Sequence, residues 1–236
     1  MEGNYLESLE QLGVGGAHPG GLALTKQLLA KEKINKATKI LDVGCGTGQT
    51  AAYLAEMYGC QISAIDASAT MIKKAKNRFR QLNVPVQSTV GYLEDMPYQE
   101  NQFDILLAES VFIFTNLALS LPACKRALKP NGKLIAIEMV IESPLPENEA
   151  NEIQEFYQIS QLLTSEEWTK IFKQTGFTVI EVLHPVEHDK PSSLDSAPDF
   201  QLSEEIDDRV FHILESHQQL LEKYKNKLGY RVFICQ

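Results

Sequence analysis

The chain has 236 residues, of which 44% are hydrophobic and 22% charged, and its formal net charge is −9. These totals are ordinary for a soluble globular protein, and the length suits one large α/β domain with a sizeable core or, as an alternative, two small domains. The acidic balance opposes a general attraction to nucleic-acid phosphates, and no apolar run is long enough to cross a bilayer. Neither nucleic acid nor a membrane is therefore an expected partner.

Four cysteines occur far apart and without CxxC spacing, at Cys45, Cys60, Cys124 and Cys235. No signal peptide is visible, so a reduced, cytoplasmic setting is expected. This pattern does not suggest a metal site, and we expect no bound metal.

The first 37 residues predict a short amphipathic segment, a loop and a helix. Residues 1–12 carry apolar side chains at helical spacing. Residues 13–21 contain five glycines, which oppose a regular element and predict a flexible loop that is either a lid or a linker. A helix is expected over residues 22–31.

The middle of the chain alternates between strand and helix patterns. Strands are expected over 40–43, 61–65, 86–90, 103–108 and 133–140, and helices over 49–58, 69–82 and 117–128. Residues 91–102 are expected to form a loop and 129–132 a turn. The alternation and the nearly continuous apolar strands predict a doubly wound, mostly parallel sheet.

The last third is harder to assign. Residues 141–161 are acidic and contain two prolines, which suggests an insertion over the ligand-binding edge of the sheet. Beyond it we expect a helix over 165–175, a strand over 177–183, a loop over 185–203, a long helix over 204–227 and a strand over 230–235.

The most informative stretch is Asp42-Val43-Gly44-Cys45-Gly46-Thr47-Gly48, between the first strand and its helix. Ligands of open α/β sheets bind at such strand ends, and glycines allow close approach of the backbone. Dinucleotide-binding oxidoreductases space their glycines as G-x-G-x-x-G, but Gln49 stands at the third position here. Asp66 ends the next strand, where a carboxylate can accept hydrogen bonds from two ribose hydroxyls.

Together these features resemble the class I S-adenosylmethionine-dependent methyltransferases, in the small-molecule branch that includes the ubiquinone and menaquinone C-methyltransferases. Residues 42–48 match the family motif letter for letter, and Asp66 matches its acidic ribose ligand. Further matches are Phe103-Asp104-Ile105, Gly176-Phe177 and, loosely, Lys129-Pro130-Asn131-Gly132. The resemblance covers residues 38–183. It implies a Rossmann-like, seven-stranded sheet with an antiparallel last strand, and methyl transfer to a small-molecule acceptor with S-adenosylhomocysteine as product.

The resemblance also implies which residues bind the cofactor. They are Asp42, Gly44, Cys45 and Gly46 around the methionine end, Asp66 at the ribose, Ala67, Met71, Leu93 and Glu94 around the adenine, and Ala108 and Glu109 near the sulfonium and methyl group. Cys45 is interpreted as a small packing residue, not a nucleophile. Tyr92 stands where the family usually has an aspartate that meets the adenine amino group; Glu94 or a backbone carbonyl takes that role, or Tyr92 stacks on the ring.

Methyl transfer is an in-line displacement that needs a general base only if the acceptor must lose a proton. His18 and Glu109 are the candidate catalytic residues. His18 is either a base or a surface or capping residue, and Glu109 is either a base or a ligand of the cofactor's amino group. Tyr5, His184 and His188 are further candidate bases. The aromatic residues Phe156, Tyr157 and Trp168 either line an acceptor pocket or pack in the core.

We therefore expect a single methyltransferase domain over residues 1–236. Residues 1–37 would form a lid segment, 38–140 the cofactor-binding core, and 141–236 the acceptor-side insertions with the last two strands. Two alternatives remain at this point: a non-catalytic protein that binds S-adenosylmethionine, and an NAD(P)-dependent oxidoreductase. The sequence identifies neither the acceptor nor the oligomeric state.

Overall fold

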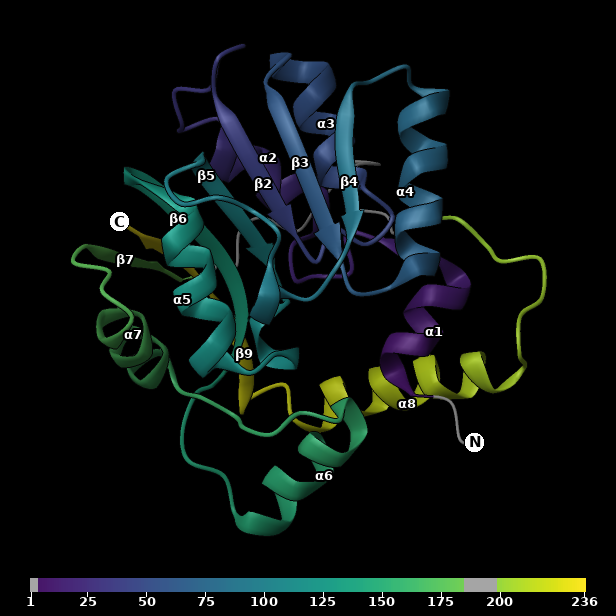
Figure 1. The fold of residues 1–236 in the computed structure, drawn as a ribbon. Helices are drawn as coiled ribbons and strands as arrows, with labels where there is room; N and C mark the ends of the chain where they lie inside the picture. Colours follow the sequence, from purple (N-terminus) through teal and green to yellow (C-terminus); the bar gives the residue numbers. More distant parts are fainter. Residues whose placement is uncertain (1–3, 185–198) are drawn as a thin grey trace.

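The computed structural model describes residues 4–184 and 199–236. Its main sheet has seven strands in the order β4-β3-β2-β5-β6-β9-β7 (Figure 1). Their bounds are Lys39–Val43 (β2), Gln61–Asp66 (β3), Val86–Val90 (β4), Phe103–Glu109 (β5), Leu128–Ile141 (β6), Ile180–Leu183 (β7) and Leu228–Cys235 (β9). β9 lies between β6 and β7 and runs antiparallel to both, while the other pairs are parallel. The expected seven-stranded, mostly parallel sheet with an antiparallel last strand is confirmed.

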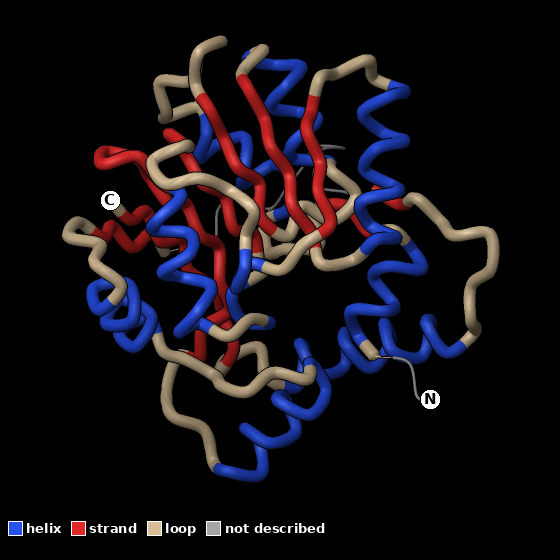
Figure 2. Tube along the Cα trace, in the orientation of Figure 1, coloured by secondary structure: helices blue, strands red, loops and turns tan. Residues whose placement is uncertain are grey.

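Helices cover both faces of this sheet (Figure 2). One face packs against α2 (Gly21–Leu29), α3 (Gln49–Tyr58) and α4 (Ala69–Gln81), and the other against α5 (Leu117–Ala127) and α7 (Ser165–Gln174). Successive side chains of a strand point to opposite faces, so along β2 Leu41 packs on the α5 side and Ile40 on the α2 side. Because both faces are buried, the strands are apolar throughout.

Three further helices gather beside the carboxyl ends of the parallel strands: α1 (Tyr5–Leu12), α6 (Glu147–Tyr157) and α8 (Arg209–Lys223) (Figure 1). Aromatic rings join them, with the Tyr5 centroid 5.1 Å from that of Tyr157 and 4.9 Å from that of His217. The Tyr157 hydroxyl lies 2.9 Å from Nδ1 of His217. Contacts between residues far apart in sequence therefore hold this group together.

A two-stranded antiparallel sheet pairs β1 (Val14–Gly15) with β8 (Asp199–Phe200). The expectation of a plain glycine loop over 13–21 is therefore wrong, as is that of a loop over the described part of 185–203; residues 185–198 lie outside the described chain. Neither segment is a strand on its own, and each becomes one only because the other supplies its hydrogen bonds. We call α1, α6, α8 and the β1–β8 pair the cap.

Two side chains of α4 fasten the β1–β8 pair to the main domain. Lys74 donates from Nζ to the carbonyl oxygens of Gln11 and Gln201, and Arg78 pairs with Asp199. Arg78 also donates from Nε to the carbonyl oxygen of Thr47, at 2.9 Å. The cap is thus tied directly to the glycine-rich turn.

Other departures from expectation are local. The acidic stretch 141–161 contains α6, because Glu147 and Glu149 favour its N-terminus and the apolar face of Ile153 and Tyr157 is buried. Residues 129–132 lie within β6, as an irregularity opposite Phe103 to Ile105. Strand β7 and helix α8 are shorter than expected. The loop 91–102 contains a short 3₁₀ helix, η1 (Leu93–Asp95), and a second, η2 (Phe112–Phe114), follows β5.

Within the described ranges, every helix is too short or too polar to span a membrane.

Candidate functional site

The chain turns sharply after β2, through residues 44–48, which we call the glycine turn. Gly44 and Gly46 have φ of +64° and +51°, a region that L side chains avoid. A Cβ atom on Gly44 would lie 2.1 Å from Cγ2 of Val111, whereas one on Gly46 would meet only the Val14 carbonyl oxygen, at 4.0 Å. The turn is therefore tightly packed at Gly44 and leaves room for a ligand at Gly46.

Asp42 sits at the end of β2, only 2% exposed, and its Oδ2 atom has no hydrogen-bond partner. Its pKa is raised well above the usual value, first by burial and then by the charges of Glu109 and Asp66, while a hydrogen bond from the Ala51 N–H opposes the shift. A buried, unpartnered carboxylate oxygen is costly. A cationic group at this position would satisfy it.

Asp66 ends β3 beside the glycine turn. Its carboxylate accepts hydrogen bonds from the backbone N–H groups of Gly46 and Ser68, each at 2.8 Å. Burial raises its pKa, and these two bonds oppose that rise. Asp66 therefore fixes the position of the turn relative to β3.

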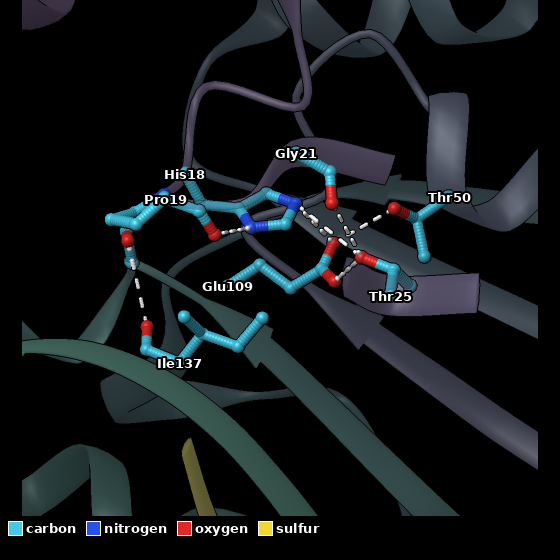
Figure 3. Close-up of polar contacts among 8 residues, drawn as sticks. His18, Pro19, Gly21, Thr25, Thr50, Glu109 and Ile137 are labelled. Atoms are coloured by element: carbon cyan, nitrogen blue, oxygen red, sulfur yellow. Dashed lines mark hydrogen bonds and ion pairs between the residues drawn. The ribbon is translucent and has the colours of Figure 1, made fainter. Parts of the chain in front are cut away.

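Glu109 ends β5, and hydroxyl groups from two helices meet its carboxylate (Figure 3). Thr25 of α2 donates to Oε1, and Thr50 of α3 donates to Oε2 at 2.7 Å. Nε2 of His18 lies 3.5 Å from Oε2. Asp42, Asp66 and Glu109 thus converge from three neighbouring strand ends, but no group of three such side chains in the described ranges has the arrangement of a metal site.

His18 belongs to the segment between β1 and α2 and is only 8% exposed. Its Nδ1 atom lies 3.2 Å from the Pro19 carbonyl oxygen, and its Nε2 atom 3.4 Å from Oγ1 of Thr25 (Figure 3). Thr25 has a single hydroxyl proton and gives it to Glu109. Both ring nitrogens therefore lie close to oxygen atoms, one to a backbone carbonyl and the other to the Thr25 hydroxyl and the Glu109 carboxylate.

The remaining expected cofactor residues line the same region with different degrees of burial. Ala67 is exposed; Met71, Leu93, Cys45 and Ala108 are buried. Burial raises the pKa of the Cys45 thiol well above its usual value, which agrees with a packing role. Glu94 accepts a hydrogen bond from the Asn116 N–H at 2.8 Å, and Tyr92 is 68% exposed.

The other candidate bases lie elsewhere. Tyr5 is buried in the cap, where burial raises its pKa to about 12, and His184 is exposed. His188 lies outside the described residues. Trp168 is 1% exposed and donates from Nε1 to the Met139 carbonyl oxygen at 3.0 Å, so it packs in the core.

Sequence reasoning missed Thr25 and Thr50, which hold Glu109. Thr50 stands in the first turn of the helix after the glycine turn, a position close to any ligand of that turn, and this was an available signal. No sequence signal pointed to Thr25, because only the packing of α2 against the sheet brings its side chain to Glu109.

Comparison with known proteins supports a specific family. A family model described as "Methyltransferase domain" matches residues 34–176. An uncharacterized methyltransferase of Bacillus subtilis, YodH, is 36% identical over 231 residues, which is 98% of each chain.

Solved structures share the fold. Phosphoethanolamine N-methyltransferase 2 of Haemonchus contortus, in complex with S-adenosyl-L-methionine, superposes with a TM-score of 0.74 at 21% identity over 92% of this chain. This chain spans about half, 53%, of that one. The MccD protein superposes with a TM-score of 0.73 at 18% identity, over 93% of this chain and 98% of its own.

Proposed function

Because the chain belongs to the methyltransferase domain family, we propose that it moves a methyl group from S-adenosylmethionine to a small-molecule acceptor by in-line displacement. The chain is a methyltransferase enzyme, and its cofactor is S-adenosylmethionine. The observation that carries the proposal is the unpartnered Oδ2 of Asp42, buried beside the open turn at Gly46. A cationic ligand would satisfy that oxygen atom, and S-adenosylmethionine carries a positive charge at its sulfonium and at its amino group.

The three acidic residues at the strand ends have different roles in binding. Asp42 and Glu109 supply negative charge toward the cationic groups, which is favourable in a site with little water. Asp66 can accept from ribose hydroxyls while it keeps its bonds from Gly46 and Ser68, because a carboxylate has about four acceptor positions. When bound, S-adenosylmethionine supplies a methyl group that is already activated for displacement.

Glu109 and His18 then act by orientation. A hydroxyl donor binds each oxygen of Glu109, so the orientation of the carboxylate is fixed. His18, whose Nε2 atom lies 3.5 Å from Oε2 of Glu109, joins the N-terminal segment to that carboxylate. Alignment alone can supply roughly 7–11 kcal/mol of rate enhancement, which suffices for a nucleophile that needs no base.

The acceptor enters from the side of the cap. In this proposal residues 1–37 form a lid, because Val14 lies against the glycine turn at Gly46, and residues 38–140 and 141–236 form the core and the acceptor side of one domain. A small-molecule acceptor agrees with the relatives whose names include one, such as phosphoethanolamine. Membership in the quinone-methylating branch stays a prediction.

Calorimetric titration with S-adenosylmethionine and S-adenosylhomocysteine tests the site. Asp66→Ala should weaken binding by roughly tenfold to several hundredfold, because hydrogen bonds to a charged acceptor contribute about 1.5–3 kcal/mol each. Asp104→Ala is the matched control: its carboxylate also accepts a backbone N–H, from Lys39 at 2.8 Å, but near the amino end of β5, whereas Asp66 lies at the carboxyl end of β3. Unchanged affinity in Asp66→Ala would contradict the ribose assignment.

Turnover needs a separate assay. S-adenosylhomocysteine release should appear with at least one member of a panel of small amines, phenols, carboxylates and activated carbon acids. Tight cofactor binding without transfer to any of them would favour the non-catalytic alternative.

A further inference from the structure

A second buried carboxylate lies close to the site, in the interior of the sheet. Glu138 is 0% exposed in β6, a strand with neighbours on both sides. Its side chain points to the α5 face, the opposite face from Glu109, because it alternates with Ile137 of the α2 face. The charged form of a carboxylate in such a place is costly unless it is compensated.

No cation compensates Glu138 within the described ranges. Arg231 stands opposite it in the register of β6 and β9, but the guanidinium binds Glu142, with Nη1 to Oε1 at 2.9 Å and Nη2 to Oε2 at 2.6 Å. The partners of Glu138 are instead three consecutive backbone N–H groups. Val111 and Phe112 donate to Oε1 at 3.2 and 3.0 Å, and Ile113 donates to Oε2 at 3.4 Å.

These donors belong to the segment that leads away from the candidate site. The chain leaves β5 at Glu109, and Ser110 adopts a φ of +58°, which is unfavourable for a residue other than glycine. The Ser110 N–H bonds to the Ile137 carbonyl oxygen at 2.7 Å. The side chain of Val111 then packs so closely over Gly44 that no Cβ fits there. The segment 110–113 therefore forms a wall of the glycine turn.

We propose that Glu138 is a positioning residue for methyl transfer: by binding the N–H groups of residues 111–113, it holds Val111 over Gly44 and Glu109 at the cofactor. This inference rests on the proposed function, because it assigns Glu138 to the same cofactor site. It explains why a carboxylate occupies a fully buried strand position where an apolar residue would otherwise be favoured.

Burial raises the pKa of Glu138 to about 8, and the three N–H bonds oppose that rise. Arg231 of β9 stands opposite Glu138 and pairs with Glu142, which directly follows β6, while Glu109 of β5 points to the other face of the sheet. Because ionisation in the folded protein is penalised, removing the charge need not lower stability. A change at Glu138 can therefore separate stability from cofactor binding.

Two variants and a control make the test. Glu138→Gln keeps an oxygen that can accept from Val111 and Phe112 but places an NH₂ group toward Ile113, while Glu138→Leu removes every acceptor. Glu142→Gln is the control, since it removes a carboxylate from the same chain segment without touching residues 110–113. Amide hydrogen exchange of residues 111–113, titration with S-adenosylhomocysteine, and the thermal midpoint are measured for each.

In Glu138→Gln we expect exchange of residues 111–113 to quicken and S-adenosylhomocysteine affinity to fall about three- to tenfold. The thermal unfolding midpoint of Glu138→Gln should stay within a few degrees of that of the wild type. Glu138→Leu should show the same changes more strongly where it folds, and Glu142→Gln should show neither. Faster exchange with unchanged affinity would overturn the positioning role, as would equal losses in the control. Failure of the wild type itself to bind S-adenosylhomocysteine would instead contradict the proposed function.

Discussion

The region around the glycine turn and the cap are assembled in different ways. Beside the glycine turn, the carboxylate of Asp66 is held by backbone N–H groups of that turn and of its own loop. In the cap, contacts join elements that are far apart in sequence, as in the pairing of Val14 with Phe200. The first kind of contact is set by the course of a short chain segment, and the second by the relative placement of whole elements.

This difference predicts different consequences of mutation. Changes in the glycine turn should affect cofactor binding directly, because in the proposed function the backbone of this turn is the binding surface. Changes in the cap should have smaller effects, because each contact there is one of several that hold the same helices. Four substitutions test this contrast, in order from the largest expected effect to the smallest.

Gly44→Ala should have the largest effect. It forces a Cβ atom into a left-handed backbone position 2.1 Å from Val111, and it should cost about 2–5 kcal/mol of stability from backbone strain and overpacking together. Cofactor binding should fall about a hundredfold or more. Urea unfolding and calorimetric titration measure the two effects.

Gly59→Ala is the matched control, because Gly59 has a similar φ of +59° but a Cβ there would meet only the Lys36 side chain at 3.7 Å. It should lose about 1–2 kcal/mol and bind cofactor normally. Equal effects of the two variants would show that the contact with Val111 is unimportant.

Asp42→Asn should reduce cofactor affinity by about tenfold to a hundredfold, because it removes a charged partner worth about 1.5–3 kcal/mol. In the wild type the raised pKa of Asp42 means that the carboxyl holds its proton above its usual pH range. A cation lowers that pKa, so binding should release a proton and tighten as the pH rises toward the pKa of Asp42. Titrations in buffers of different ionisation enthalpy count this proton, and the Asp42→Asn variant should release none at this position.

Arg78→Ala should weaken cofactor binding by about two- to tenfold, the value of one ordinary hydrogen bond, because Arg78 joins Thr47 of the glycine turn to Asp199 of the cap. Arg80→Ala on the same helix is the control, since the Arg80 side chain donates to the exposed Asn77 on its own helix. A loss as large as that of Gly44→Ala would mean that the cap, too, forms the binding surface.

Tyr157→Phe should have the smallest effect, confined to the cap. It removes the 2.9 Å contact with His217 and should lower the free energy of unfolding by about 0.5–1.5 kcal/mol, with cofactor affinity unchanged. Tyr92→Phe, its control, removes a hydroxyl from a residue that is 68% exposed and should change stability by less than about 0.5 kcal/mol. Urea unfolding distinguishes the two.

The sequence predicted the strand, turn and helices around residues 39–82 well because their signals are local. The glycine spacing and the helix N-cap at Ser68, which accepts from the Met71 N–H at 3.0 Å, each act within a few residues. The sequence also named His18 and Glu109 as candidate catalytic residues, but it did not show that their side chains lie 3.5 Å apart. Nothing in it pointed to Glu138, which looks like a polar residue at the end of an apolar strand.

The sequence alone determined the alternation of strands and helices, the course of the glycine turn and the acidic residues at the ends of β2, β3 and β5. These depend on local periodicity, on backbone freedom at glycine and on the short reach of capping groups. Only the tertiary structure decided that residues 14–15 and 199–200 pair, that Thr25 and Thr50 hold Glu109, and that Glu138 binds the segment beside Gly44. In each case, polar groups have no hydrogen-bond partner within their own segment. Their partners lie in segments that are distant in sequence and meet only when the sheet has formed.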